Sequence, residues 1–248
     1  MTSTSVRATW CALVLMAVLG GACAPVPGEQ SAVGPPDEAV AVLPATSSER
    51  AEAPLLHALS VERVARQVTV RVRARGCGRL GTASAVAIGP RLLVTNRHVV
   101  QGTDTLELNY WDGTSATARL LAVAVADDLA LVRVSIRLPT VARLATDDPA
   151  ERAKVLIVGY PNGDRQKITR GSVVEYARLR APADASPVMR MSAAIVPGNS
   201  GGAVVDRTGA LVGVVFGVET ETGYGLAIPV SAVDALRDTG GRPPTADC

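Results

Sequence analysis

Residues 105–136 have the sequence TLELNYWDGTSATARLLAVAVADDLALVRVSI, and their pattern indicates the fold class. Three apolar runs, 105–110, 116–125 and 129–136, are each long enough for one strand and are separated by turn residues. The pair Asp112-Gly113 is typical of a type I′ hairpin turn, in which both central residues need a positive φ. We therefore expect consecutive antiparallel strands here, because no segment of helix length separates the runs.

The same pattern extends in both directions along the chain. The other short apolar runs are 68–74, 84–88, 91–95, 155–159, 171–176 and 188–192. Many short strands without long helices between them favour antiparallel barrels or a sandwich. Two six-stranded barrels, split near residues 140–150, fit the length of 248 residues. A short helix is expected over 55–66, before the first strand, and a second over 231–237, at the end of the last barrel.

Composition limits the class of protein. A hydrophobic share of 48% is enough for a sizeable core and argues against disorder over most of the chain. The formal net charge is only +2, from 25 basic and 23 acidic residues without a long run of one sign. Nucleic acid is therefore not an expected partner, since its binding needs a basic stripe that displaces counterions.

The N-terminus has the pattern of an export signal over residues 1–24. Arg7 supplies a positive charge, residues 11–19 are apolar, and small residues follow. Two outcomes stay open, a lipid anchor on Cys23 and a freely secreted protein. Residues 25–53 are rich in Ala, Pro, Ser and Glu and are expected to form a flexible linker.

Three further segments carry the residue types of a nucleophilic hydrolase. They are Leu93-Val-Thr-Asn-Arg-His-Val-Val100, Asp127-Asp-Leu-Ala-Leu-Val-Arg-Val134 and Pro197-Gly-Asn-Ser-Gly-Gly-Ala203. A serine hydroxyl is a weak nucleophile, so an imidazole must take its proton, and a carboxylate must orient that imidazole. The tetrahedral intermediate carries a negative oxygen that needs hydrogen-bond donors, and the glycines after the serine let the chain turn sharply where a side chain would obstruct the substrate.

These segments resemble the motifs of trypsin-like serine proteases, in particular the bacterial HtrA-like branch. The order His, Asp, Ser matches that family, as do the intervals from 98 to 128 and from 128 to 200. The resemblance covers about residues 62–238 and implies an all-β fold of two six-stranded antiparallel barrels, with the active site in the cleft between them. One departure is Gly81-Thr-Ala-Ser-Ala-Val86, which has alanines where HtrA-like enzymes usually have glycines.

The implied domains are an N-terminal barrel over 54–145, a C-terminal barrel with a closing helix over 146–240, and a tail over 241–248, without a PDZ domain. The implied catalytic residues are His98, Asp128 and Ser200, with the amides of Gly198 and Ser200 as the oxyanion hole. Asp128 is preferred over Asp127 because it directly precedes an apolar strand, which leaves Asp127 as a solvated turn residue. His57, which lies before the first strand, is expected to be packed or on the surface.

The resemblance also implies a pocket for the substrate side chain before the scissile bond. Its residues are Ala194, Phe216, Gly217 and Tyr224. Since none is charged, we expect a small or medium apolar side chain there, because an unpaired buried cation would cost several kcal/mol.

If Cys11 leaves with the export signal and Cys23 is lipidated or free, Cys77 and Cys248 remain. One hypothesis is that these two form a disulfide, and the other is that both are free thiols.

The expected function is an exported serine endopeptidase that needs no cofactor and acts on polypeptides. The membrane would be contacted only through the lipid anchor. Two alternatives are a catalytically silent binding module of the cell envelope and a different acyl-transferring enzyme or esterase.

Overall fold

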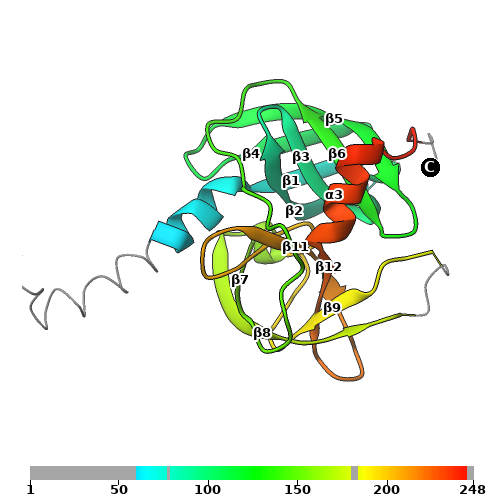
Figure 1. Ribbon diagram of the computed structural model, residues 1–248. Helices are drawn as coiled ribbons and strands as arrows, with labels where there is room; N and C mark the ends of the chain where they lie inside the picture. The colour runs from blue at the N-terminus through cyan, green and yellow to red at the C-terminus, as the bar shows by residue number, and fades with distance from the viewer. Residues whose placement is uncertain (1–59, 77–78, 180–183, 245–248) are drawn as a thin grey trace, which may run out of the picture. The chain divides into compact units, whose positions relative to one another are not determined.

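The computed structural model describes residues 60–76, 79–179 and 184–244 (Figure 1). The expected export signal, the linker, His57, Cys77 and Cys248 lie outside the described residues. Within the described part, residues 60–68 are helical and lead into the first strand, as the sequence predicted for 60–66. No helix among the described residues is both long and apolar enough to cross a membrane.

The first barrel is closed and has the strand order β1-β2-β3-β6-β5-β4, with every neighbouring pair antiparallel. Its strands are β1 (Thr69–Gly76), β2 (Arg79–Gly89), β3 (Leu92–Asn96), β4 (Thr105–Asn109), β5 (Ser115–Ala124) and β6 (Leu129–Val134). A one-turn helix, α2 (Arg97–Val100), follows β3. The interior is filled by small and branched side chains such as Val72, Ala85 and Leu108.

The second barrel is also closed, in the order β10-β11-β12-β9-β8-β7. Its strands are β7 (Lys154–Gly159), β8 (Lys167–Ala177), β9 (Val188–Met191), β10 (Ala203–Val205), β11 (Leu211–Val218) and β12 (Gly225–Pro229). A 3-10 turn, η1 (Pro161–Gly163), lies between β7 and β8. The predicted fold class, two six-stranded antiparallel barrels, is confirmed.

The C-terminal helix α3 (Val230–Thr239) connects the barrels, and it begins one residue before the predicted helix and ends two after it. Figure 1 shows α3 beside β6 of the first barrel and next to β12 of the second. Val233 and Leu236 enter a core that also contains Leu129 from the first barrel and Val214 from the second. This shared core buries apolar surface from both barrels and so holds them against each other.

The β4–β5 hairpin forms as expected, but its turn differs from the predicted type I′. Gly113 has φ +87°, whereas Asp112 keeps a negative φ. The amide of Gly113 donates to the carbonyl of Tyr110 at 3.1 Å, and Tyr110 pairs with Thr114 across a three-residue loop. Such loops commonly end in a glycine with left-handed backbone. The loop has one residue more than a type I′ turn. With that extra residue, one positive φ, at Gly113, is enough to reverse the chain.

Candidate active site

His98 lies on α2, immediately after a buried strand of the first barrel. The helix is fixed at both ends: Val100 is buried, and the amide of Arg97 donates to the carbonyl of Asp128 at 2.7 Å. The His98 side chain is 46% exposed, so one side of the imidazole faces solvent. The short helix thus presents this ring at the edge of the barrel, next to the turn that carries Asp128.

Asp128 holds the histidine at two points. Its Oδ1 accepts a hydrogen bond from the backbone N–H of His98 at 3.0 Å, and its Oδ2 lies 2.5 Å from the imidazole Nδ1. The residue has φ +51°, a left-handed conformation that aspartate adopts more readily than most residues. With Nδ1 engaged by the carboxylate, Nε2 is the nitrogen left for a substrate or nucleophile.

Ser200 comes from the second barrel, just before β10. Its hydroxyl donates to the carbonyl oxygen of Phe216 at 3.4 Å. The Phe216 ring meets the imidazole of His98 edge to face, with ring centroids 6.3 Å apart. Among the described residues the hydroxyl makes no hydrogen bond to His98. Phe216 therefore contacts both the serine and the histidine side chains in this conformation.

The turn before Ser200 is fixed in one backbone conformation. The amide of Asn199 donates to the carbonyl of Val196 at 3.1 Å, and Gly198 at the third position has φ +92°, which favours glycine. A Cβ at Gly198 would lie 2.3 Å from the carbonyl oxygen of Tyr160. Only glycine fits this position, for both conformational and steric reasons.

The peptide between Pro197 and Gly198 has a defined direction. Its carbonyl accepts a hydrogen bond from the amide of Asn162 at 2.8 Å. Since the C=O and N–H of a trans peptide point in opposite directions, the Gly198 N–H points away from Asn162. In the described part of the chain, the amides of Gly198 and Ser200 donate to no protein acceptor. Two N–H groups are thus available beside the serine hydroxyl.

Ser84 joins the first barrel to this turn, and the sequence analysis did not identify it. Its hydroxyl donates to the carbonyl of Gly198 at 2.8 Å and accepts from the amide of Tyr160 at 3.0 Å. Its backbone amide donates to the carbonyl of Ser200 at 2.8 Å. Ser84 is completely buried in β2, within the segment that departs from the HtrA-like glycine pattern. A serine between alanines in that segment was the only available signal.

Three of the residues expected to form the side-chain pocket lie near the end of β11 and the start of β12, and the fourth, Ala194, follows β9. Phe216, Gly217 and Tyr224 are half-buried, and Ala194 is exposed. Ile195, which the sequence analysis did not single out, is only 7% exposed, and a Cβ on Gly225 would lie 2.6 Å from its Cγ1. The side chain of Ile195 therefore packs against the start of β12.

A carboxylate also lies in the β11–β12 hairpin. Glu219 Oε1 lies 2.5 Å from Arg190 Nη2, and the hydroxyl of Thr222 donates to the other oxygen of Glu219. Arg190 reaches Glu175 as well, at 2.7 Å. The hydrogen bond from Thr222, followed by that from Arg190, lowers the pKa of Glu219 below its ordinary value. Its charge is thus already compensated by a neighbouring arginine.

Asp127 has a role that the sequence did not predict. It lies in the turn before β6, as expected, but its Oδ1 accepts a hydrogen bond from the amide of Ser186 at 2.7 Å. Ser186 precedes β9, so Asp127 connects the Asp128 turn to the second barrel. The described residues contain no cluster of three or more His, Cys, Asp or Glu that could hold a metal ion.

The two-barrel fold and the residues around His98 and Ser200 indicate to which class of protein the chain belongs. A family model described as a trypsin-like peptidase domain matches residues 83–214, and the chain belongs to that family. The resemblance that the sequence motifs indicated is therefore confirmed, and the relatives below extend it to the HtrA branch.

Three bacterial relatives are similar in sequence. Serine protease Rv3671c of Mycobacterium tuberculosis is 29% identical over 167 residues, which cover 63% of this chain and 42% of the relative. Serine protease Do-like HtrA of Bacillus subtilis is 30% identical over 162 residues, 60% of this chain and 36% of the relative. The Probable periplasmic serine endoprotease DegP-like of Marinomonas sp. is 29% identical over 157 residues, 60% of this chain and 34% of the relative. The chain thus spans less than half the length of these relatives.

The fold is shared with a solved structure as well. The active form of the Rv3671c protease from M. tuberculosis superposes with a TM-score of 0.68 and 26% sequence identity. The similar region covers 86% of this chain and 97% of that chain.

Proposed function

We propose that this chain is a serine endopeptidase that hydrolyses peptide bonds through an acyl-enzyme, with His98, Asp128 and Ser200 as its catalytic residues. The observation that carries the proposal is the 2.5 Å contact between Asp128 Oδ2 and His98 Nδ1, with Phe216 joining that histidine to Ser200. The carboxylate keeps the proton on Nδ1, so Nε2 can accept the proton of the Ser200 hydroxyl.

The catalytic cycle follows from these positions. Ser200 Oγ attacks the substrate carbonyl while His98 Nε2 takes its proton, and the imidazolium is stabilised by Asp128. The negative oxygen of the tetrahedral intermediate is bound by the free amides of Gly198 and Ser200. His98 then returns the proton to the leaving amine, and a water molecule releases the acyl group by the same steps. No cofactor takes part in this scheme.

Ser200→Ala tests the proposal directly. Wild-type protein should be labelled by a fluorophosphonate probe, and Ser200→Ala should not be labelled. Hydrolysis of casein or of a peptide library should fall by about 10⁶ in kcat, because the three residues act as a unit. A chain that stays unlabelled in the wild type would instead be a silent binding module. Labelling together with cleavage of esters but not of peptides would indicate an esterase.

We propose an apolar preference for the residue before the scissile bond. The proposed lining is uncharged and consists of Ala194, Ile195, Phe216, Gly217 and Tyr224. The nearby carboxylate of Glu219 is already engaged by Arg190. A peptide library should be cut after Val, Ala, Leu or Met. Cleavage chiefly after Lys or Arg would contradict the assignment.

We also propose that the protein is exported and acts on polypeptides in the cell envelope or outside the cell. The leader pattern of residues 1–24 supports this, and one relative is named periplasmic. Intact mass distinguishes a lipid on Cys23 from a cleaved and secreted form. The same measurement with and without reductant tests the hypothesis of a Cys77–Cys248 disulfide, which predicts a mass gain of two hydrogen atoms on reduction.

A further inference from the structure

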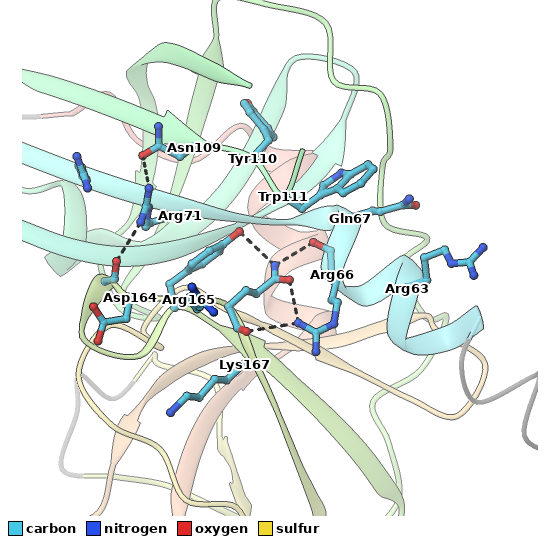
Figure 2. Close-up of a pocket in the computed structure, with 14 residues that line it drawn as sticks. Arg63, Arg66, Gln67, Arg71, Asn109, Tyr110, Trp111, Asp164, Arg165 and Lys167 are labelled. Atoms are coloured by element: carbon cyan, nitrogen blue, oxygen red, sulfur yellow. Dashed lines mark hydrogen bonds between the residues drawn. The ribbon is translucent and has the colours of Figure 1, made fainter. Parts of the chain in front are cut away.

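A large cavity lies away from the proposed catalytic residues, and none of His98, Asp128 and Ser200 lines it. It has a volume of about 1180 Å³ and is lined by the helix at 60–68, by β1, by the β4–β5 hairpin and by the η1–β8 segment (Figure 2). Six of its lining residues are cationic: Arg63, Arg66, Arg71, Arg73, Arg165 and Lys167. We call this cavity the basic trough.

The positive charge of the basic trough is only partly offset by neighbouring acids, such as Glu107 opposite Arg73 in the β1–β4 register. Asp164 is the one carboxylate of its lining, against six cations. Across the described ranges, no ion pair within 4.0 Å involves any of these six side chains. The whole chain carries a net charge of only +2, so this concentration of cations is local. Clustered like charges destabilise a fold, and a bound anion would relieve that repulsion.

Two of the guanidinium groups are held in place by uncharged partners. Arg71 donates to the carbonyl of Gly163 at 3.2 Å and to Asn109 Oδ1 at 3.1 Å, and it lies 5.9 Å from the centre of the Tyr160 ring. Figure 2 shows Arg71 between Asn109 and the η1–β8 segment. Arg66 donates to the backbone carbonyl of Gln166 at 3.4 Å. Both cations are therefore positioned before any ligand binds, while their charge stays available.

The shape and lining of the basic trough fit a polypeptide better than a small molecule. Its volume exceeds the roughly 300–1,000 Å³ of most small-ligand pockets. The amide side chain of Gln67 can pair with peptide groups, and Trp111, which is 48% exposed, offers an aromatic surface. Arginine forks match carboxylates in geometry as well as in charge.

We propose that the basic trough binds an acidic, carboxylate-rich segment of a polypeptide substrate, at a position separate from the bond that is cut. The identity of the ligand as a substrate rests on the proposed endopeptidase function, whereas the binding of an acidic polypeptide does not. The two can therefore fail separately.

Binding is tested with the full-length Ser200→Ala chain, which needs no catalysis. A fluorescent peptide containing four glutamates is compared by anisotropy with its glutamine counterpart of the same length. We expect the acidic peptide to bind at least tenfold more tightly at about 0.05 M salt and to lose most of this advantage at about 0.5 M.

Charge variants locate the site. Arg165→Gln/Lys167→Gln removes two exposed cations of the basic trough, whereas Arg119→Gln/Arg133→Gln removes two exposed arginines that face each other across β5 and β6. The first double variant should weaken binding by about 2- to 30-fold, the effect of two exposed ion pairs, and the second should not change it. Equal loss in both, or equal affinity for the two peptides, would overturn the proposal. One more result would overturn the proposal: the acidic peptide does not bind, whereas inorganic polyphosphate binds and loses affinity only in the first double variant.

Cleavage tests the link to substrate in the active chain. Appending the glutamate segment to a cleavable peptide should lower KM and leave kcat unchanged. Arg165→Gln/Lys167→Gln should cancel that gain without altering cleavage of the short neutral peptide. If the acidic peptide binds but the appended glutamate segment does not improve cleavage, the binding site for acidic segments is supported and its role in substrate recognition is refuted.

Discussion

Ser84→Ala should lower activity although the residue lies outside the proposed catalytic set. The Ser84 hydroxyl is the only side-chain group from the first barrel that the structure places, among the described residues, on both Gly198 and Tyr160. By holding the Gly198 carbonyl it fixes the peptide that follows Gly198, and with it the turn that directs two amides toward the proposed oxyanion. Alanine removes the hydroxyl without adding bulk.

The magnitude follows from the two hydrogen bonds. Ser84 is fully buried, so its loss leaves one buried carbonyl and one buried N–H without this partner. A stranded buried polar group costs about 1–3 kcal/mol, and we expect the free energy of unfolding to fall by about 2–6 kcal/mol in total for the two groups. If about 1.4–2.7 kcal/mol of this cost appears as a displaced turn in the reacting state, kcat/KM falls by about 10- to 100-fold.

The matched control is Thr95→Val. The Thr95 hydroxyl is equally buried and donates to the backbone carbonyl of Ser84 at 2.8 Å, yet it makes no hydrogen bond to the Gly198 turn. Steady-state cleavage of a short peptide and urea unfolding are measured on both variants. Both should lose stability, and only Ser84→Ala should lose kcat/KM by more than about threefold. An unchanged kcat/KM in a destabilised Ser84→Ala would refute a role in positioning the turn.

Three further predictions concern single residues. Asp128→Asn should lower kcat by about 10⁴, because an amide no longer fixes the imidazole tautomer, whereas Asp127→Asn, one residue away, should stay within about threefold in the same peptide assay. Gly198→Ala should lower kcat by about 10²–10³, the loss of one oxyanion donor, since its Cβ would meet Tyr160 at 2.3 Å; burst kinetics would reveal whether acylation is the step affected. Glu219 has a lowered pKa, so its stabilising contribution is present above the ordinary carboxyl pKa and is lost as pH falls through the folded value. Glu219→Gln should therefore lower Tm more at about pH 6 than at about pH 3, and an equal loss at both values would exclude this linkage.

The amino-acid sequence by itself determined the architecture and the candidate catalytic residues. Alternation of period two and regularly placed turn residues are local properties, so the runs predicted from the sequence correspond to all six strands of the first barrel and to β7, β8 and β9 of the second. The strands β10, β11 and β12 were not among these runs. His98, Asp128 and Ser200 could be singled out because each lies in a short contiguous motif. The choice of Asp128 over Asp127 agrees with the contact between Asp128 and His98.

Only the tertiary structure showed which groups support that site. Ser84 and Asn162 act on the Gly198 turn from far away along the chain, one through a hydroxyl and the other through a backbone amide. The basic trough likewise joins the arginines of residues 63–73 to Arg165 and Lys167, which lie far away along the chain. Such contacts depend on how two barrels pack together, and a hydrogen bond between distant segments leaves no periodic pattern in either one.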